Sequence, residues 1–418
     1  MIILLHYYTI NKNFLKMWSS NLSSVLGQRF RELVIPIIVL TLTASPLITA
    51  LVALSQQAGG LLFAIPAGTW IESKDKRNVM IYSKAISSVL LLILSFLLFQ
   101  GEFTSLLIAV VLFLLGIVGL LSRTAFNSLI PKVSGRENLV NAHTSLEAAD
   151  AISTLIGPIV AGFFLAQFGS AATILVCGGL MLISMLFILS VQVTGETIDN
   201  HTNKVGNKEK LKKFWQQAVE GFTILFTNTS QVVCTIVICL LSFSTTFVVL
   251  TVVIHGKTAM DLEPDRIGLL LSCAGVGNIA GVVLLRWVKK LSWIPLLSIM
   301  LIVSGMGTLL IGMGTNFYVA CFGMFLFDGA LSMAFVIQAS IHQGITPDHM
   351  LSRVKSSTYV MGGISGILGT FLSGAIPEAV NSYIALWTGA SVLIVPSVLL
   401  LFLTSHSTRV DKVEPLQM

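Results

Sequence analysis

Two long apolar runs, residues 45–71 and 79–99, flank a short charged turn, residues 68–77. An apolar helix of about 20 residues leaves a soluble protein no solvated face, but its length matches the hydrocarbon core of a bilayer. Only 11% of the chain is charged, against about 25% in ordinary globular domains. The runs also lack the alternating polar positions of barrel strands. We therefore predict an all-α integral membrane protein.

The same pattern of apolar runs recurs along the whole chain and predicts twelve membrane-spanning helices. They are expected at residues 18–42, 46–70, 79–99, 105–130, 141–166, 170–193, 231–254, 266–286, 293–313, 317–341, 355–376 and 383–404. One long polar interruption, rich in lysine, divides them into two groups of six. We expect an N-terminal six-helix bundle at 1–193, a cytoplasmic central loop at 194–221 and a C-terminal six-helix bundle at 222–418. Segments 127–131 and 343–347 are alike, as duplicated halves or chance would produce.

The distribution of basic residues predicts the orientation. With both termini in the cytoplasm, most of the 25 Lys and Arg residues fall in segments that face inward. This count includes Lys84, which we place with the loop between the second and third spans. The opposite orientation would put nearly all of these positive charges outside, against the positive-inside rule. We therefore expect a multi-pass protein of the plasma membrane with both termini in the cytoplasm.

Several other functions find no support in the sequence. The net charge of +6 is dispersed among loops rather than gathered in a basic patch, which disfavours nucleic-acid binding. Residues 255–258 look like the end of a phosphate-binding loop, but position 251 is Thr251 where that motif needs glycine, so we expect no ATP. The five cysteines lie in apolar runs, so we expect buried side chains and no metal site. An intramembrane enzyme would need a nucleophile and base that we cannot assemble.

The charged turn resembles the signature of the major facilitator superfamily between its second and third spans. The matching residues are Gly68, Glu72, Lys76 and Arg77. Ser73 and Asp75 depart from the pattern, where an arginine and a glycine are common. The resemblance implies a major facilitator fold of two pseudo-symmetric six-helix bundles that alternate access to a cavity near the midplane.

A second resemblance lies in the fifth predicted span. Gly157, Pro158 and Gly162 are similar to the Gly-Pro motif associated with exporters of the superfamily. Proline removes a backbone donor and bends a helix, and glycine lets a neighbour pack closely. Segments 42–46, 123–131 and 352–354 are also similar to the branch that contains macrolide exporters and the enterobactin exporter. This branch implies bacterial efflux and drug or macrolide resistance.

The first predicted span carries four polar residues, which are costly inside a membrane. They are Gln28, Arg29, Arg31 and Glu32. At about 100° per residue they share one side of the helix, which must face water, a partner or a substrate. A carboxylate held between burial and an arginine can take up a proton on one side of the membrane and release it on the other. A permanently paired structural cluster is the alternative, and both remain open.

The fifth predicted span carries a polar stripe that leads to the Gly-Pro motif. His143, Glu147 and Asp150 lie at helical spacing on one face. Arg123 lies at a comparable depth across the preceding hairpin, so we predict a pair between Arg123 and either Glu147 or Asp150. A structural or gating role is favoured for these charges, because they lie toward the cytoplasmic end.

Asp328 is the lone acid in the membrane part of the second half. We expect it near the midplane, facing a cavity, and either protonated or paired with Arg29 or Arg31. Together the buried acids and the resemblances predict proton-driven efflux of a lipophilic or amphiphilic small molecule, such as a drug, a macrolide-like compound or a siderophore. The expected partners are this substrate, protons and membrane lipids, with no cofactor. An uptake symporter or a lysophospholipid transporter on the same fold is the alternative.

Overall fold

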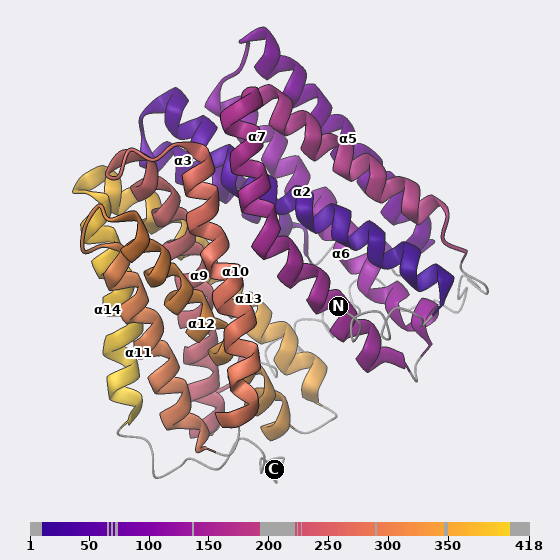
Figure 1. Cartoon of the computed structure of the whole chain (residues 1–418). Helices are drawn as coiled ribbons and strands as arrows, with labels where there is room; N and C mark the ends of the chain where they lie inside the picture. Colours follow the sequence, from indigo (N-terminus) through magenta and orange to yellow (C-terminus); the bar gives the residue numbers. More distant parts are fainter. Residues whose placement is uncertain are drawn as a thin grey trace. The chain divides into compact units, whose positions relative to one another are not determined.

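The regular elements of the computed structural model are α helices (Figure 1). The structure describes residues 11–64, 67, 70–71, 74–135, 138–192, 222–223, 225–226, 228–288, 291–346 and 350–401. Nine of the helices in this described part are long and apolar enough to cross a membrane. The predicted class, an all-α membrane protein, is confirmed.

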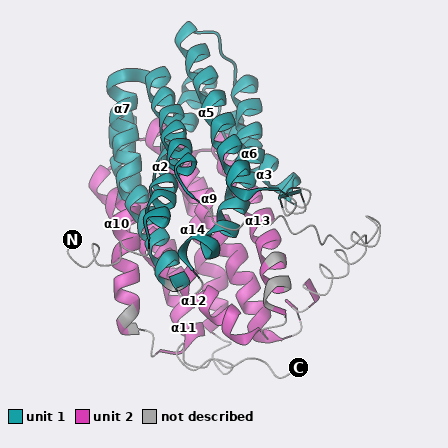
Figure 2. Cartoon of the chain, turned by 90° about the vertical axis from the view of Figure 1, so that its right-hand side faces the viewer, with its two compact units in different colours: residues 1–200, 261–272 teal, residues 201–260, 273–418 magenta. Residues whose placement is uncertain are grey.

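The chain forms two compact units (Figure 2). Unit 1 is Met1–Asn200 with Asp261–Ser272, and unit 2 is His201–Met260 with Cys273–Met418. Unit 1 holds α2 (Lys12–Thr43), α3 (Pro46–Leu62), α5 (Lys76–Gln100), α6 (Ser105–Ser134) and α7 (Leu139–Leu189). Unit 2 holds α9 (Thr229–Thr258), α11 (Trp293–Ile311), α12 (Phe317–Ile345), α13 (Leu351–Ala379) and α14 (Ser382–Leu401). Helix α10 (Pro264–Val288) begins in unit 1 and ends in unit 2.

Three predicted spans differ in detail from the helices observed. The spans expected at 141–166 and 170–193 are joined in α7, whose one non-helical residue is Gly169, with φ 76° and ψ −179°. A residue with a side chain rarely adopts this conformation, so the glycine turns the chain where we expected a loop. In the span expected at 46–70, α3 ends at Leu62 after 17 residues, and the described residues 64, 67 and 70–71 beyond it are again helical. The predicted central loop lies outside the described residues.

Helix α5 shows how a membrane helix is divided into two faces. The side chain of Asp75 accepts a hydrogen bond from the Asn78 N–H and so caps the helix start. Large exposed side chains follow one stripe, namely Tyr82, Ile86, Val89, Ile93 and Phe96. The buried face mixes apolar side chains with serines, and the hydroxyls of Ser88 and Ser95 donate to backbone carbonyls of α7. The apolar stripe therefore suits lipid, and the serine face suits a close helix partner.

The same pairing pattern occurs within each unit. In unit 1, α2 packs against α7, α5 packs against α6 and α7, and α3 packs against α6. In unit 2, α9 packs against α13, and α11 packs against α12 and α14. Helix α10 meets α12 in the position that corresponds to α3 and α6, because Gly277 faces the backbone of Phe325 and Gly329. The two bundles are thus pseudo-symmetric in their internal packing.

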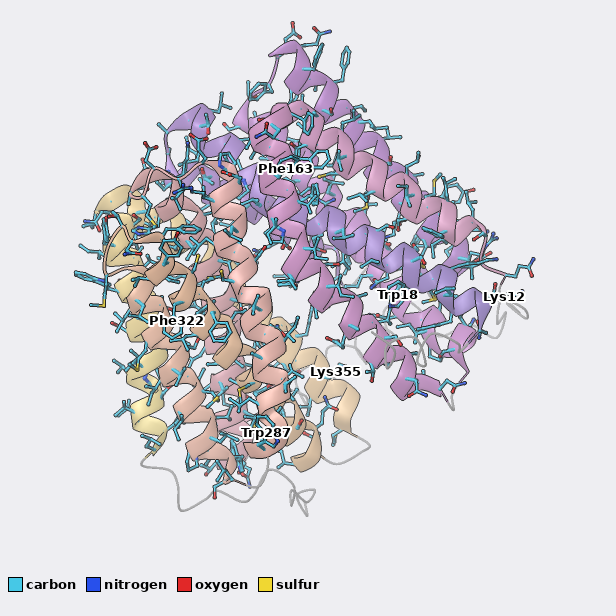
Figure 3. The ribbon with its side chains drawn as sticks, viewed as in Figure 1. Lys12, Trp18, Phe163, Trp287, Phe322 and Lys355 are labelled. Carbon is cyan, nitrogen blue, oxygen red and sulfur yellow. The ribbon has the colours of Figure 1, made fainter. Side chains whose placement is uncertain are left out.

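Bulky apolar side chains lie on the outside of both units. Phe163 of α7 is 51% exposed, Trp287 of α10 is 75% exposed and Phe322 of α12 is 56% exposed (Figure 3). A soluble domain rarely exposes so many large apolar side chains, whereas the hydrocarbon core of a bilayer covers them. The outer surface therefore agrees with a membrane-spanning fold.

Glycines allow the backbones of α3 and α6 to touch. A Cβ atom added at Gly116 would lie 2.1 Å from the Gln56 carbonyl oxygen. A Cβ atom added at Gly119, on the same helix, would meet nothing within 4 Å. We therefore predict that Gly116→Ala destabilises the protein by about 1–3 kcal/mol, the usual cost of overpacking.

This prediction is tested by the temperature at which the detergent-solubilised protein loses its monodisperse size-exclusion peak. Gly119→Ala is the control, because it adds the same methyl group where there is space. Equal midpoints for the two variants would contradict close packing of α3 and α6.

Candidate transport site

The guanidinium of Arg29 connects α2 to α7 within unit 1. Its Nη1 lies 2.9 Å from Oε2 of Glu32, and its Nη2 lies 3.3 Å from Oδ1 of Asp150. Gln28 donates from Nε2 to the other oxygen of Glu32 at 2.7 Å. One cation therefore holds two carboxylates, one on its own helix and one on the neighbouring helix.

Gly157 makes room for this connection. A Cβ atom added at Gly157 would lie 2.7 Å from Cβ and 3.3 Å from Cγ of Arg29. The aliphatic stem of the arginine therefore lies directly over the glycine, and its charged end reaches back along α7 to Asp150. Gly157 thus helps to position the arginine.

The four polar residues of the first span do not all share one environment. Gln28 and Glu32 are exposed and Arg29 is partly buried, but the side chain of Arg31 is buried, with 9% of its surface exposed. Arg31 therefore turns into the bundle, unlike Gln28 and Glu32, and its predicted role in transport stays a prediction. The four residues were predicted to share a wide side of the helix, and Arg31 lies at one edge of that side, where the helix packs into the bundle.

The polar stripe of α7 is observed, but its predicted partner is not. His143 and Glu147 are exposed and Asp150 is partly buried, on the face of α7 that meets Arg29. The predicted pair of Arg123 with Glu147 or Asp150 is wrong: within the described part of unit 1, Asp150 pairs with Arg29, and the exposed Arg123 makes no salt bridge with either acid.

Lys84 is the functional candidate that the sequence interpretation missed. Its side chain lies in α5 with only 8% of its surface exposed, whereas we expected it beside a cytoplasmic loop. The ammonium donates a hydrogen bond to Oγ of Ser24 on α2. Its position in the sequence was the available signal. Lys84 lies eight residues after Lys76, the first residue of α5, and is therefore two turns inside the helix.

The charged turn is partly described. Gly68 and Glu72 lie outside the described residues, so their predicted roles stay predictions. Lys76 and Arg77 belong to the first turn of α5 rather than to a loop, and Arg77 donates to the Leu189 carbonyl at 2.6 Å. Arg77 therefore ties the start of α5 to the end of α7.

The Gly-Pro motif lies against the first residues of α10, which belong to unit 1. A Cβ atom at Gly162 would lie 2.4 Å from the Pro264 carbonyl oxygen, and one at Gly268 would lie 2.2 Å from that of Pro158. The backbone remains helical at Pro158. Close backbone packing is therefore the observed contribution of this motif.

Unit 2 carries polar groups of its own. Asp328 is partly buried on α12, and its predicted pairing with Arg29 or Arg31 stays a prediction. A buried network missed by the sequence interpretation joins α9 to the end of α12. In it, Gln231 donates to the Thr346 hydroxyl at 2.9 Å, and Gln338, 3.3 Å from Nδ1 of His342, donates to the Cys234 carbonyl. Glutamine inside an apolar run was the available signal.

No metal-ligand group is found in the described ranges. Of the cysteines, Cys177 and Cys234 are buried, as we expected, while the other three are partly exposed, and all five are free.

Comparison with known proteins identifies the fold. A family model described as the Major Facilitator Superfamily matches residues 17–370. No curated protein sequence matches the chain. A crystal structure of a bacterial homologue of the iron transporter ferroportin, in an inward-facing state, has a TM-score of 0.71 at 17% identity and covers 94% of this chain and 99% of that one.

Two further structures show the same likeness. A POT family transporter in complex with a thioalcohol-conjugated peptide has a TM-score of 0.73 at 13% identity, covering 96% of both chains. The nucleoside transporter NupG has a TM-score of 0.67 at 13% identity, covering 94% of this chain and 99% of that one. At these identities the likeness shows a shared fold alone.

The contact between Gly157 and Arg29 generates a prediction. Gly157→Ala should displace the arginine and weaken its pairing with Asp150, because the added methyl group would overlap the arginine stem. We expect a loss of about 1–3 kcal/mol in stability. The measurement is thermal unfolding of the purified full chain.

Gly179→Ala provides the control, since a Cβ atom at this position of α7 meets nothing within 4 Å. If both variants unfold at the wild-type temperature, the close contact between Arg29 and Gly157 is absent.

Proposed function

The chain belongs to the Major Facilitator Superfamily, a family of transporters and not of enzymes, and from this premise we propose that it exports a lipophilic or amphiphilic small molecule by proton antiport. The observation that carries the proposal is the Arg29 network of unit 1. It offers two carboxylates on one cation, at a surface that unit 1 exposes.

A proton changes this network in a defined way. Protonation of Glu32 or Asp150 removes a negative charge and replaces an ion pair with a weaker hydrogen bond between the charged guanidinium and a neutral carboxyl group. Because Arg29 connects α2 to α7, loss of one pair alters the contact between two helices. A group that binds the proton and a helix contact that responds to it are the two parts that coupling requires.

The substrate class rests on apolar and aromatic side chains next to the network. Phe30, which follows Arg29, lies 6.4 Å from Phe164, and Phe164 lies 5.3 Å from Phe168, between ring centroids. Aromatic groups with a few polar neighbours suit an amphiphilic molecule, such as a drug, a macrolide-like compound or a siderophore. The outward direction rests on the resemblance of Gly157 and Pro158 to exporters.

Location and energy source complete the proposal. We place the chain in the plasma membrane of a bacterium, with both termini in the cytoplasm, on the support of its Lys and Arg distribution. The driving force is the proton gradient, with no organic cofactor, ATP or nucleic acid.

An uptake symporter or a lysophospholipid transporter on the same fold is the competing function, since the similar structures include a peptide-bound transporter and a nucleoside transporter. Counterflow in vesicles of known orientation separates import from export. Accumulation on the side that corresponds to the cytoplasm would favour the competitor.

The proton-coupling prediction concerns Glu32 and Asp328. Glu32→Gln and Asp328→Asn remove the charge but keep the size, so each should lower gradient-driven transport at least tenfold while exchange without a gradient continues. The measurement is flux in proteoliposomes with an imposed pH gradient, over a panel of erythromycin, N-phenyl-1-naphthylamine and 1-anilinonaphthalene-8-sulfonate.

Glu102→Gln is the control, because Glu102 is exposed and follows the end of α5. This variant should transport as the wild type does. Gradient-driven flux that survives in both Glu32→Gln and Asp328→Asn would show that neither acid couples transport to protons.

A further inference from the structure

Unit 1 buries two basic side chains from different helices. Arg31 of α2 and Lys84 of α5 have 9% and 8% of their surfaces exposed. A charged side chain is costly to bury in a membrane protein, so such groups normally pair with an acid or bind a functional partner. The positive charges of Arg31 and Lys84 therefore require a compensating partner.

Arg31 has unused hydrogen-bond donors. Its Nε and Nη1 atoms are buried and have no hydrogen-bond partner. An arginine cannot shed its proton to relieve this, because its guanidinium stays charged in proteins. The nearest acid in sequence, Glu32, already accepts hydrogen bonds from Arg29 and Gln28.

Lys84 adds a like charge to the same region. Its ammonium donates to the neutral hydroxyl of Ser24, which lies two helical turns before Arg31 on the same side of α2, so two like charges share this part of the bundle. The groups that α7 contributes to this region are neutral: the sulfur of Met181 lies 3.8 Å from Oγ of Ser24, and Cys177, one helical turn earlier, is fully buried. Within the described part of unit 1, no ion pair joins Arg31 or Lys84 to an acid.

We propose that Arg31 and Lys84 form a binding site for one anionic group, a carboxylate, phosphate or sulfonate, carried by the transported amphiphile. The unpartnered guanidinium N–H groups and the ammonium supply charge-assisted donors, which such oxygens accept strongly. Bound there, the anion balances the repulsion between the two cations. The neighbouring side chains of Cys177 and Met181 carry no negative charge that would compete with the bound anion.

The Arg29 network lies between the surface of unit 1 and this site. Arg31 is next to Glu32, whose carboxylate lies at the surface of unit 1 in contact with Arg29 and Gln28. A substrate anion that reaches Arg31 would enter past these residues. The site thus narrows the proposed substrate class from amphiphiles in general to amphiphiles with a negative group. The inference rests on the proposed function only for the source of the anion.

The test compares two probes that share one skeleton. 1-Anilinonaphthalene-8-sulfonate carries a sulfonate, and N-phenyl-1-naphthylamine is the same molecule without it. Binding to the full chain is measured by equilibrium dialysis in phosphatidylcholine nanodiscs, with empty discs subtracted. We expect Lys84→Met to weaken binding of the sulfonate at least tenfold, about 1.4 kcal/mol, and to change binding of the neutral probe less than twofold.

Matched variants keep the test decisive. Lys84→Arg retains the charge and should restore sulfonate binding to within threefold. Lys132→Met applies the same substitution to an exposed lysine of unit 1 and should bind as the wild type does. If Lys84→Met loses its monodisperse size-exclusion peak, Arg31→Gln takes its place with the same expectation.

Three outcomes would overturn the inference. In the first, Lys84→Met weakens the binding of both probes equally. In the second, Lys84→Met binds the sulfonate probe as tightly as the wild type does. In the third, inorganic phosphate at millimolar concentration stabilises the wild type but not Lys84→Met, and it does not displace the sulfonate probe. The last result would assign the pair to a free ion. Because no gradient is applied, a failure of proton antiport would leave the binding result unchanged, and the two proposals fail separately.

Discussion

The low polarity of the bilayer core is the constraint on which the rest of this structure depends. Inside it, a charge has to find compensation within the protein, because water is absent. Arg29 meets this requirement with Glu32 and Asp150, and it can do so because Gly157 gives its stem space over α7. The contact between α2 and α7 therefore depends on the direction of the Arg29 side chain, which in turn depends on the glycine at position 157.

The same constraint explains the close packing of the helices. Since lipid is as apolar as a leucine side chain, helices gain little by burying large residues and instead bring their backbones together. Gly59 and Gly116 do this in unit 1, and Gly277 and Gly329 do it in unit 2. The repetition of this contact at corresponding places agrees with two related bundles.

The sequence predicts the membrane class and the helix positions well, because a run of about 20 apolar residues has few other uses. It predicts the partners of charges poorly. Helical spacing gives the phase along one helix, but the rotation of α2 against α7 comes from packing, so Asp150 was matched to Arg123 instead of Arg29. Lys84 was misplaced for a related reason: a positive charge near a loop counts toward orientation whether or not its side chain turns inward. Gly169 was not recognised as a turn that joins two spans.

Proton antiport through the Arg29 network requires that protons cross the membrane in the opposite direction to the substrate. The direct measurement is the external pH of a weakly buffered suspension of proteoliposomes loaded with a transported amphiphile, diluted into substrate-free medium with valinomycin and potassium present. Outward substrate flux should draw protons inward and make the medium more alkaline, whatever the orientation of the protein. A medium that stays at constant pH, or becomes more acidic, while substrate leaves would contradict proton antiport.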